Sequence, residues 1–195
     1  MGGVVMKKIK LITAISQQDA EEFVKQLELE SSRLCNIEEH MYECLKKFIH
    51  DNTGLENGCV VCVQMIEGDD VNIEQHFDDL SDYVPASTGS VVLEMLIDKD
   101  MVFSIGFEDY IRFNNAFEKA SDLEREFLEE DLRNVIKIGN LKDDDTDAVI
   151  SFIPMFHAKE CTQFLVLNEN WEGEEMELAG IKPVKLRRMD LSNEL

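Results

Sequence analysis

The sequence KIKLITAI, residues 8–15, alternates polar and apolar side chains before it becomes mainly apolar, a pattern that predicts a β-strand. Ser16 follows directly, and Asp19 stands three residues later, where a capping box usually has Glu. A serine at this position accepts a hydrogen bond from a backbone N–H of the first helical turn. We therefore expect the chain to change from strand to helix at Ser16.

Two helices are predicted after this strand, at about 17–34 and 37–50. In each, the apolar residues recur on one face. They are Phe23, Leu27 and Leu34 in the first helix, and Ile37, Met41, Leu45, Phe48 and Ile49 in the second. Turn residues at 52–58, which include two glycines, are expected to end the second helix.

The other predicted strands are short segments rich in Val, Ile and further apolar residues. They are expected at 59–67, 71–77, 91–97, 101–107, 148–154, 161–167 and 176–186. Only short turns separate the first segment from the second and the third from the fourth, which predicts a hairpin in each case.

Helical periodicity returns at 108–138, with a break expected at Ser121 because Ser121 and Glu124 have the spacing of a second capping box. Strands and helices thus occur in groups rather than as a repeating strand–helix–strand series. This order predicts an α+β fold with a mixed, mainly antiparallel sheet and helices packed on one face.

One domain is expected at 7–188, after a leader or disordered start at 1–6 and before a frayed C-terminus at 189–195. Gly2 and Gly3 can be encoded by a purine-rich ribosome-binding site shortly before Met6. On that interpretation Met6 is the true start and the source is a bacterium or a phage. The alternative is that the two glycines form a flexible N-terminus.

The chain has 41 acidic and 19 basic residues, which gives a formal net charge of -22. Such a charge repels nucleic-acid phosphates and anionic membranes, so neither is an expected partner. It favours a basic protein partner instead. The alternative is that the acidity confers only solubility.

Five cysteines and no long apolar stretch predict a cytoplasmic protein with reduced thiols. Cys59 and Cys62 have CxxC spacing, which occurs in redox and zinc sites. Both lie in a predicted strand, where residues three apart face opposite sides. We therefore expect two small buried side chains rather than a reactive pair.

Acidic residues are densest between Glu67 and Asp100, where ten carboxylates accompany a single base, Lys99. Carboxylates interleaved with aromatic residues are typical of a surface that binds a basic groove. The residues expected to bind the partner are Asp69, Asp70, Glu74, Asp78, Asp79, Asp82 and Tyr83. The alternative is a solvated hairpin face.

Basic residues gather near the two chain ends, and they would form one stripe if the terminal strands were neighbours. They are Lys7, Lys8, Lys10, Lys182, Lys185, Arg187 and Arg188.

Two other acidic segments invite a metal-site interpretation, but each departs from a known pattern. His76 stands between Glu74 and Asp78 and would have a raised pKa among these carboxylates. Residues 143–147 are rich in Asp but lack the glycine and terminal Glu of a calcium loop. Glycine-rich phosphate loops and nucleophile elbows are also missing from the sequence. No catalytic residue, metal or cofactor is therefore expected.

These observations favour a non-enzymatic acidic protein that neutralises or inhibits a basic partner, as toxin-immunity proteins and phage DNA mimics do. A nuclease or another nucleic-acid-binding protein would be such a partner. Two alternatives stay open. One is a metal-dependent hydrolase without a readable motif, and the other is a regulatory accessory protein whose acidity is incidental.

Overall fold

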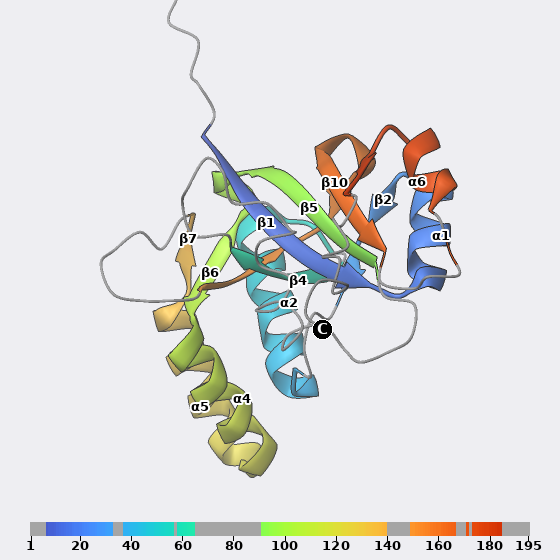
Figure 1. The fold of residues 1–195 in the computed structure, drawn as a ribbon. Coiled ribbons are helices and arrows are strands. Elements are labelled where there is room, and N and C mark those ends of the chain that lie inside the picture. Colours follow the sequence, from blue (N-terminus) through green and yellow to red (C-terminus); the bar gives the residue numbers. More distant parts are fainter. Residues whose placement is uncertain are drawn as a thin grey trace, which may run out of the picture.

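The computed structural model describes residues 7–32, 37–56, 58–64, 91–139, 149–166, 171 and 173–184. Nine strands form one sheet in the order β11-β10-β5-β1-β4-β8-β6-β7, with β3 paired to β4 outside this path (Figure 1). Their bounds are β1 Lys8–Ile15, β3 Ser31–Ser32, β4 Cys59–Gln64, β5 Val91–Asp98, β6 Phe103–Gly106, β7 Lys137–Ile138, β8 Val149–Ile153, β10 Cys161–Val166 and β11 Lys182–Pro183. Two further strands, β2 Glu28–Leu29 and β9 Phe156–His157, pair with each other.

The helices are α1 Gln17–Gln26, α2 Glu39–Thr53, α4 Phe107–Lys119, α5 Asp122–Val135 and α6 Glu174–Leu178, with short 3-10 turns at Lys99–Met101 and Ala158–Glu160. In the large sheet only the β10–β11 and β3–β4 pairs are parallel. The α+β class and the mainly antiparallel sheet are therefore confirmed.

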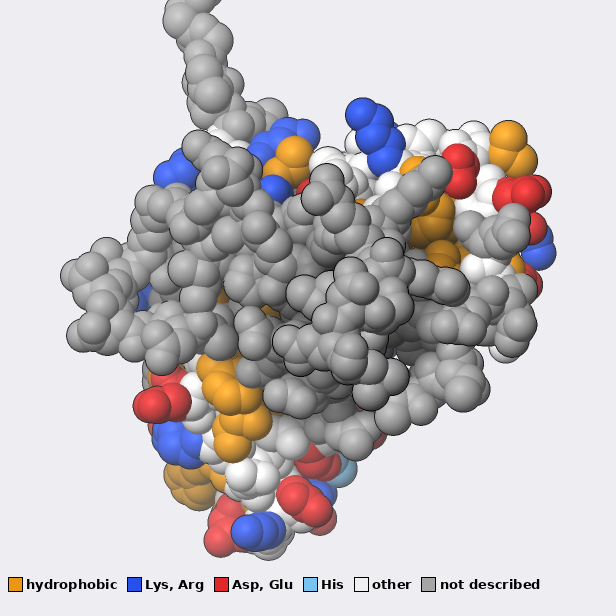
Figure 2. Space-filling view, viewed as in Figure 1, with side chains coloured by type: hydrophobic (Ala, Val, Ile, Leu, Met, Phe, Trp, Pro, Cys, Tyr) orange, Lys and Arg blue, Asp and Glu red, His pale blue; other side chains and the backbone are white. Residues whose placement is uncertain are grey.

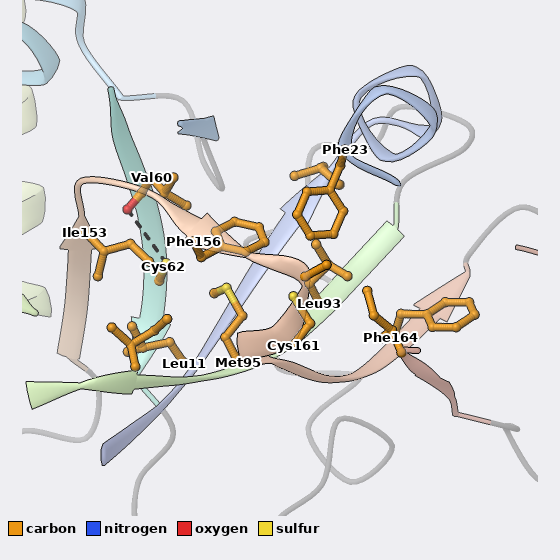
Figure 3. Close-up of a cluster of buried hydrophobic side chains, with 14 of the residues drawn as sticks. Leu11, Phe23, Val60, Cys62, Leu93, Met95, Ile153, Phe156, Cys161 and Phe164 are labelled. Atoms are coloured by element: carbon orange, nitrogen blue, oxygen red, sulfur yellow. Dashed lines mark hydrogen bonds between the residues drawn. The ribbon is translucent and has the colours of Figure 1, made fainter. Parts of the chain in front are cut away.

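The sheet is buried on both faces, and β4 shows why. Val60 and Cys62 point into a first core, whereas Cys59 and Val61 point into a second one. α1 and α6 contribute to the first core, drawn in Figure 3, and α2, α4 and α5 to the second. The expected packing of the helices on one face is not confirmed, because helices contribute to both cores. A strand such as β4, apolar from its first to its fifth residue, needs cover on both faces.

The change from strand to helix at Ser16 is confirmed, since the N–H of Asp19 donates to Ser16 Oγ at 3.0 Å. The prediction that this helix continues to residue 34 is wrong. α1 ends at Gln26, and Leu27 takes a left-handed φ of 62° while its N–H donates to the Phe23 carbonyl oxygen at 2.6 Å. The chain turns here because the next two residues pair with β9.

The predicted hairpin of 91–97 with 101–107 is also wrong. β5 pairs along its whole length with β1 and on its other side with β10, whereas β6 pairs with β8 and β7. Nearly every residue of β5 is buried, so it occupies an interior position with a neighbour on each side. The other predicted hairpin partner, 71–77, lies outside the described residues.

The break at Ser121 is confirmed. Its N–H and its hydroxyl both donate to Glu124 Oε2 at 2.7 Å, and α5 starts at the next residue. The predicted strands at 59–67, 148–154 and 161–167 correspond to β4, β8 and β10. The strand predicted at 176–186 is wrong over most of its length, because Met176 is a buried residue of α6 and only Lys182–Pro183 pairs with the sheet.

Candidate partner-binding surface

The seven residues expected to bind a partner, Asp69 to Tyr83, lie outside the described residues, so their role stays a prediction. The same holds for His76 and for the acidic loop at 143–147. Of the segment that contains them, the structure describes the part from Val91 onward.

Glu94 belongs to this acidic segment, but its side chain is only 4% exposed. It stands at the middle of β5, between Ile12 of β1 and Gln163 of β10. The hydroxyl of Thr162 donates to Glu94 Oε1 at 2.6 Å, whereas the buried Oε2 has no hydrogen-bond partner. Glu94 is therefore a buried polar group and not part of a docking surface.

A β-bulge brings Thr162 to this carboxylate. Cys161 pairs with Met95 and Gln163 pairs with Glu94, so Thr162 is an extra residue on β10. Bulges redirect side chains in this way and often occur near functional sites. One carboxylate and one hydroxyl do not make a catalytic set, and within the described residues no three or more His, Cys, Asp or Glu side chains are placed to hold a metal ion.

The four described cysteines are thiols, and the environments of Cys44, Cys62 and Cys161 disfavour the reactive thiolate. Cys59 and Cys62 face opposite cores, as predicted. Burial raises the pKa of the Cys62 and Cys161 thiols well above the usual range. Burial, together with nearby Glu129, also raises the pKa of Cys44, to about 12. These thiols act as packed side chains.

The imidazole of each of the three described histidines forms one ion-pair contact with a carboxylate, and the backbone N–H of His157 also donates to Glu160. Nδ1 of His40 is 3.2 Å from Glu38, and that of His50 is 3.5 Å from Asp51. His157 approaches Glu28 at 3.8 Å. All three stand at the surface as separate pairs, so this arrangement offers neither a metal site nor a catalytic pair.

The α4–α5 hairpin is different, because it extends from the body of the molecule (Figure 1). It also exposes large apolar side chains. Leu123 and Phe127 of α5 are 72% and 66% exposed. They are four residues apart and hence share one face of the helix. Leu132, on the opposite side, is buried in the second core. We call Leu123 and Phe127 the outer stripe of α5.

Carboxylates line both sides of the outer stripe. With about 100° of rotation per residue, Glu126 and Glu130 fall on one side of it, and Glu124 and Asp131 on the other. α5 contains six carboxylates and only two arginines. Figure 2 shows acidic and hydrophobic side chains mixed at this end of the molecule.

Three basic residues of α5 and α2 form ion pairs away from the outer stripe. Arg125 pairs with Asp122 of the same helix at 3.0 Å. Arg133 reaches Asp51 of α2 at 2.9 Å, and Lys47 of α2 reaches Glu129 at 3.8 Å, so two ion pairs join α5 to α2.

The outer carboxylates have no such partners. Glu126, Glu130 and Asp131 make no ion pair with any residue that the structure describes. The outer stripe is therefore bordered by carboxylates whose charge no ion pair within the described part of the chain offsets.

The sequence analysis missed this surface because it noted helical periodicity over 108–138, with a break at Ser121, and did not separate the apolar residues of the second helix into two faces. Leu123 and Phe127 are out of phase with Leu128 and Leu132, which carry the inward pattern. The presence of two sets of helically spaced apolar residues was the feature of the sequence that could have indicated this surface.

The expected basic stripe at the chain ends is not supported. β11, which contains Lys182, is separated from β1 by β10 and β5, so the terminal strands are not neighbours. Residues 185–188 lie outside the described part of the chain.

No family model, curated protein or solved structure matches this chain. None of the helices in its described parts has the length and apolar character needed to cross a membrane.

Proposed function

We propose that this chain is a non-enzymatic acidic protein that binds a basic protein in the cytoplasm and neutralises or inhibits it. The observation that carries the proposal is the outer stripe of α5, an exposed apolar surface bordered by carboxylates, three of which make no ion pair with any described residue. Exposed apolar patches with a polar rim mark interaction sites. A net charge of -22 makes a basic surface the complementary one and accelerates its encounter.

Among acidic inhibitors, the composition of this surface favours a protein of the toxin-immunity kind over a DNA mimic. A mimic needs carboxylates in phosphate-like rows, and an apolar stripe has no counterpart on a nucleic-acid backbone. Leu123 and Phe127 instead offer the apolar centre of a protein–protein interface, with a charged rim around it. A bacterial or phage toxin that acts on nucleic acid has the expected basic surface.

The alternative of a metal-dependent hydrolase receives less support from the described residues. Glu94 is a buried carboxylate with an oxygen that has no hydrogen-bond partner, but no group of three or more His, Cys, Asp or Glu side chains among them is placed to hold a metal ion. Metal analysis of the purified full chain by mass spectrometry tests this alternative directly. A stoichiometric transition metal that survives dialysis would favour it.

The proposal is tested by isolating partners on the immobilised full chain at about 50 mM salt and eluting them in steps up to 1 M. Basic proteins should be retained and should elute as screening shortens the range of charge attraction. Their own activity, such as nuclease activity, should fall when the chain is added. Retention of acidic or neutral proteins only, or a partner with undiminished activity, would contradict the proposal.

A further inference from the structure

We propose that the outer stripe of α5 binds a basic amphipathic α-helix of the partner, laid along α5 with its apolar residues on Leu123 and Phe127. This inference rests on the proposed function and specifies the chemistry of its partner. The described residues of α5 supply the three features that the argument uses, namely shape, charge and rigidity.

The shape of the surface fits a helix. Leu123 and Phe127 lie one helical turn apart on an element of about 21 Å, at about 1.5 Å per residue. A narrow apolar line on a convex helix matches the apolar line of a second helix, whose side chains pack between those of the first. An added strand would instead need unpaired backbone groups, which a helix face does not offer.

The charges specify which helix it is. Glu126 and Glu130 are four residues apart on one side of the outer stripe, so Lys or Arg residues spaced by one turn can meet both. Glu124 and Asp131 supply the second row, although Glu124 also accepts the hydrogen bonds of the capping box. A partner helix with basic residues on both sides of its apolar line is therefore complementary.

α5 is held in place before any partner arrives. The capping box fixes its first turn, and Leu132 anchors it in the second core. Two ion pairs with α2, Arg133–Asp51 and Lys47–Glu129, also hold α5 in place. A preformed surface of this kind binds without an ordering cost of its own.

A second copy of this chain is a poor occupant. In a two-fold symmetric contact the same surface meets itself, so the carboxylates around one outer stripe would face those of the other. Like charges placed opposite each other at an interface are strongly unfavourable. The basic partner helix avoids this repulsion.

The probe is a synthetic 18-residue peptide with Leu on one helical face and Lys on both sides of it, titrated into the full chain. We expect binding that weakens with salt, together with a gain of peptide helicity in circular dichroism. A second peptide is identical except for a central Leu→Pro change, which breaks the helix. It should bind at least about tenfold more weakly. Equal binding of the two peptides would overturn the helical mode.

Two matched pairs of variants test the location. Leu123→Gln with Phe127→Gln should weaken peptide binding about tenfold, as expected for central apolar anchors, whereas Leu178→Gln, at an 88% exposed position on α6, should not. Glu126→Gln with Glu130→Gln should weaken it at low salt more than Glu174→Gln with Glu175→Gln, two exposed acids of α6. All positions are exposed, so the melting temperature should stay unchanged.

Equal affinity of the α5 and α6 variants would overturn the inference. The outcome is separable from that of the proposed function. If the isolated basic partner binds the Leu123→Gln, Phe127→Gln variant as tightly as the original chain, the proposed function stands and the location on α5 is wrong. If no basic partner is retained in the first place, the proposed function itself fails.

Discussion

α2 and α5 both pack on the second core, yet they use their apolar residues differently. α2 buries four large side chains, Met41, Tyr42, Leu45 and Ile49, whereas Leu132 is the one fully buried residue of α5. α5 instead leaves Leu123 and Phe127 exposed. The requirements of the core account for the sequence of α2 but not for the outer face of α5. Exposed Leu and Phe with no packing role point to binding.

The first test of this difference between α2 and α5 compares how substitutions on each helix change the free energy of unfolding. Leu45→Ala on α2 removes a fully buried side chain and should cost about 2–5 kcal/mol of unfolding free energy. Leu123→Gln on α5 should change it by less than about 0.5 kcal/mol, as exposed substitutions usually do. Urea denaturation followed by circular dichroism measures both. A large loss for Leu123→Gln would mean that this side chain is part of the core.

The second test concerns how each helix begins. At the start of α2, the N–H of Met41 donates to the Glu38 carboxylate at 2.9 Å, and the N–H of Glu38 donates to Asn114 of α4 at 2.7 Å. α5 depends on the local capping box at Ser121. Ser121→Ala should therefore cost about 1 kcal/mol, a typical value for a lost cap. An unchanged urea midpoint would show that packing alone fixes the start of α5.

The third and smallest effect is on pH dependence. Hydrogen bonds from the Ser121 hydroxyl and N–H lower the pKa of Glu124, and the hydrogen bond from Arg133 lowers that of Asp51. A carboxylate with a lowered pKa in the folded state stabilises the fold above its unfolded pKa of about 4. It loses that contribution as pH falls through the folded value.

The melting temperature of the variant with Glu124→Gln and Asp51→Asn should consequently fall less between pH 5 and pH 2 than that of the original chain. Thermal melts across this range provide the measurement, with Glu174→Gln and Glu175→Gln as a control for the loss of two exposed acids. Parallel curves for the two double variants would contradict the account, since the expected difference rests on the hydrogen bonds that Glu124 and Asp51 accept.

The sequence predicted those features that depend on neighbouring residues. The caps at Ser16 and Ser121 were predictable because the side chain that accepts or donates lies within three residues of its partner. The opposite orientation of Cys59 and Cys62 followed from the two-residue period of a strand. The α+β class followed from the order of the elements.

Features set by distant residues were not predictable in this way. α1 ends at Gln26 because β2 pairs with β9, more than a hundred residues later in the chain. β5 and β6 are consecutive, yet each finds other partners in the sheet. Burial of Glu94 likewise depends on strands from three parts of the chain. Its acidic side chain alone would have indicated a position at the surface, which is wrong.

For the candidate site, the local density of carboxylates predicted a binding surface at residues 69–83 and none on α5. The outer stripe is recognisable only once the inward face of α5 is known from its contact with the second core. A sequence pattern gives the phase of a helix, but the fold decides which phase faces the solvent.

The central claim is that α5 attracts and binds a basic partner, and association kinetics test it most directly. The association rate constant of the isolated partner should be measured by stopped flow between 20 mM and 500 mM salt with two double variants of the chain. One carries Glu126→Gln and Glu130→Gln on α5, and the other carries Glu174→Gln and Glu175→Gln on α6. Both double variants have the same net charge, so any difference between them reports the location of the charge. The account predicts slower association for the α5 variant at low salt and convergence at high salt. Equal rates at every salt concentration would contradict it.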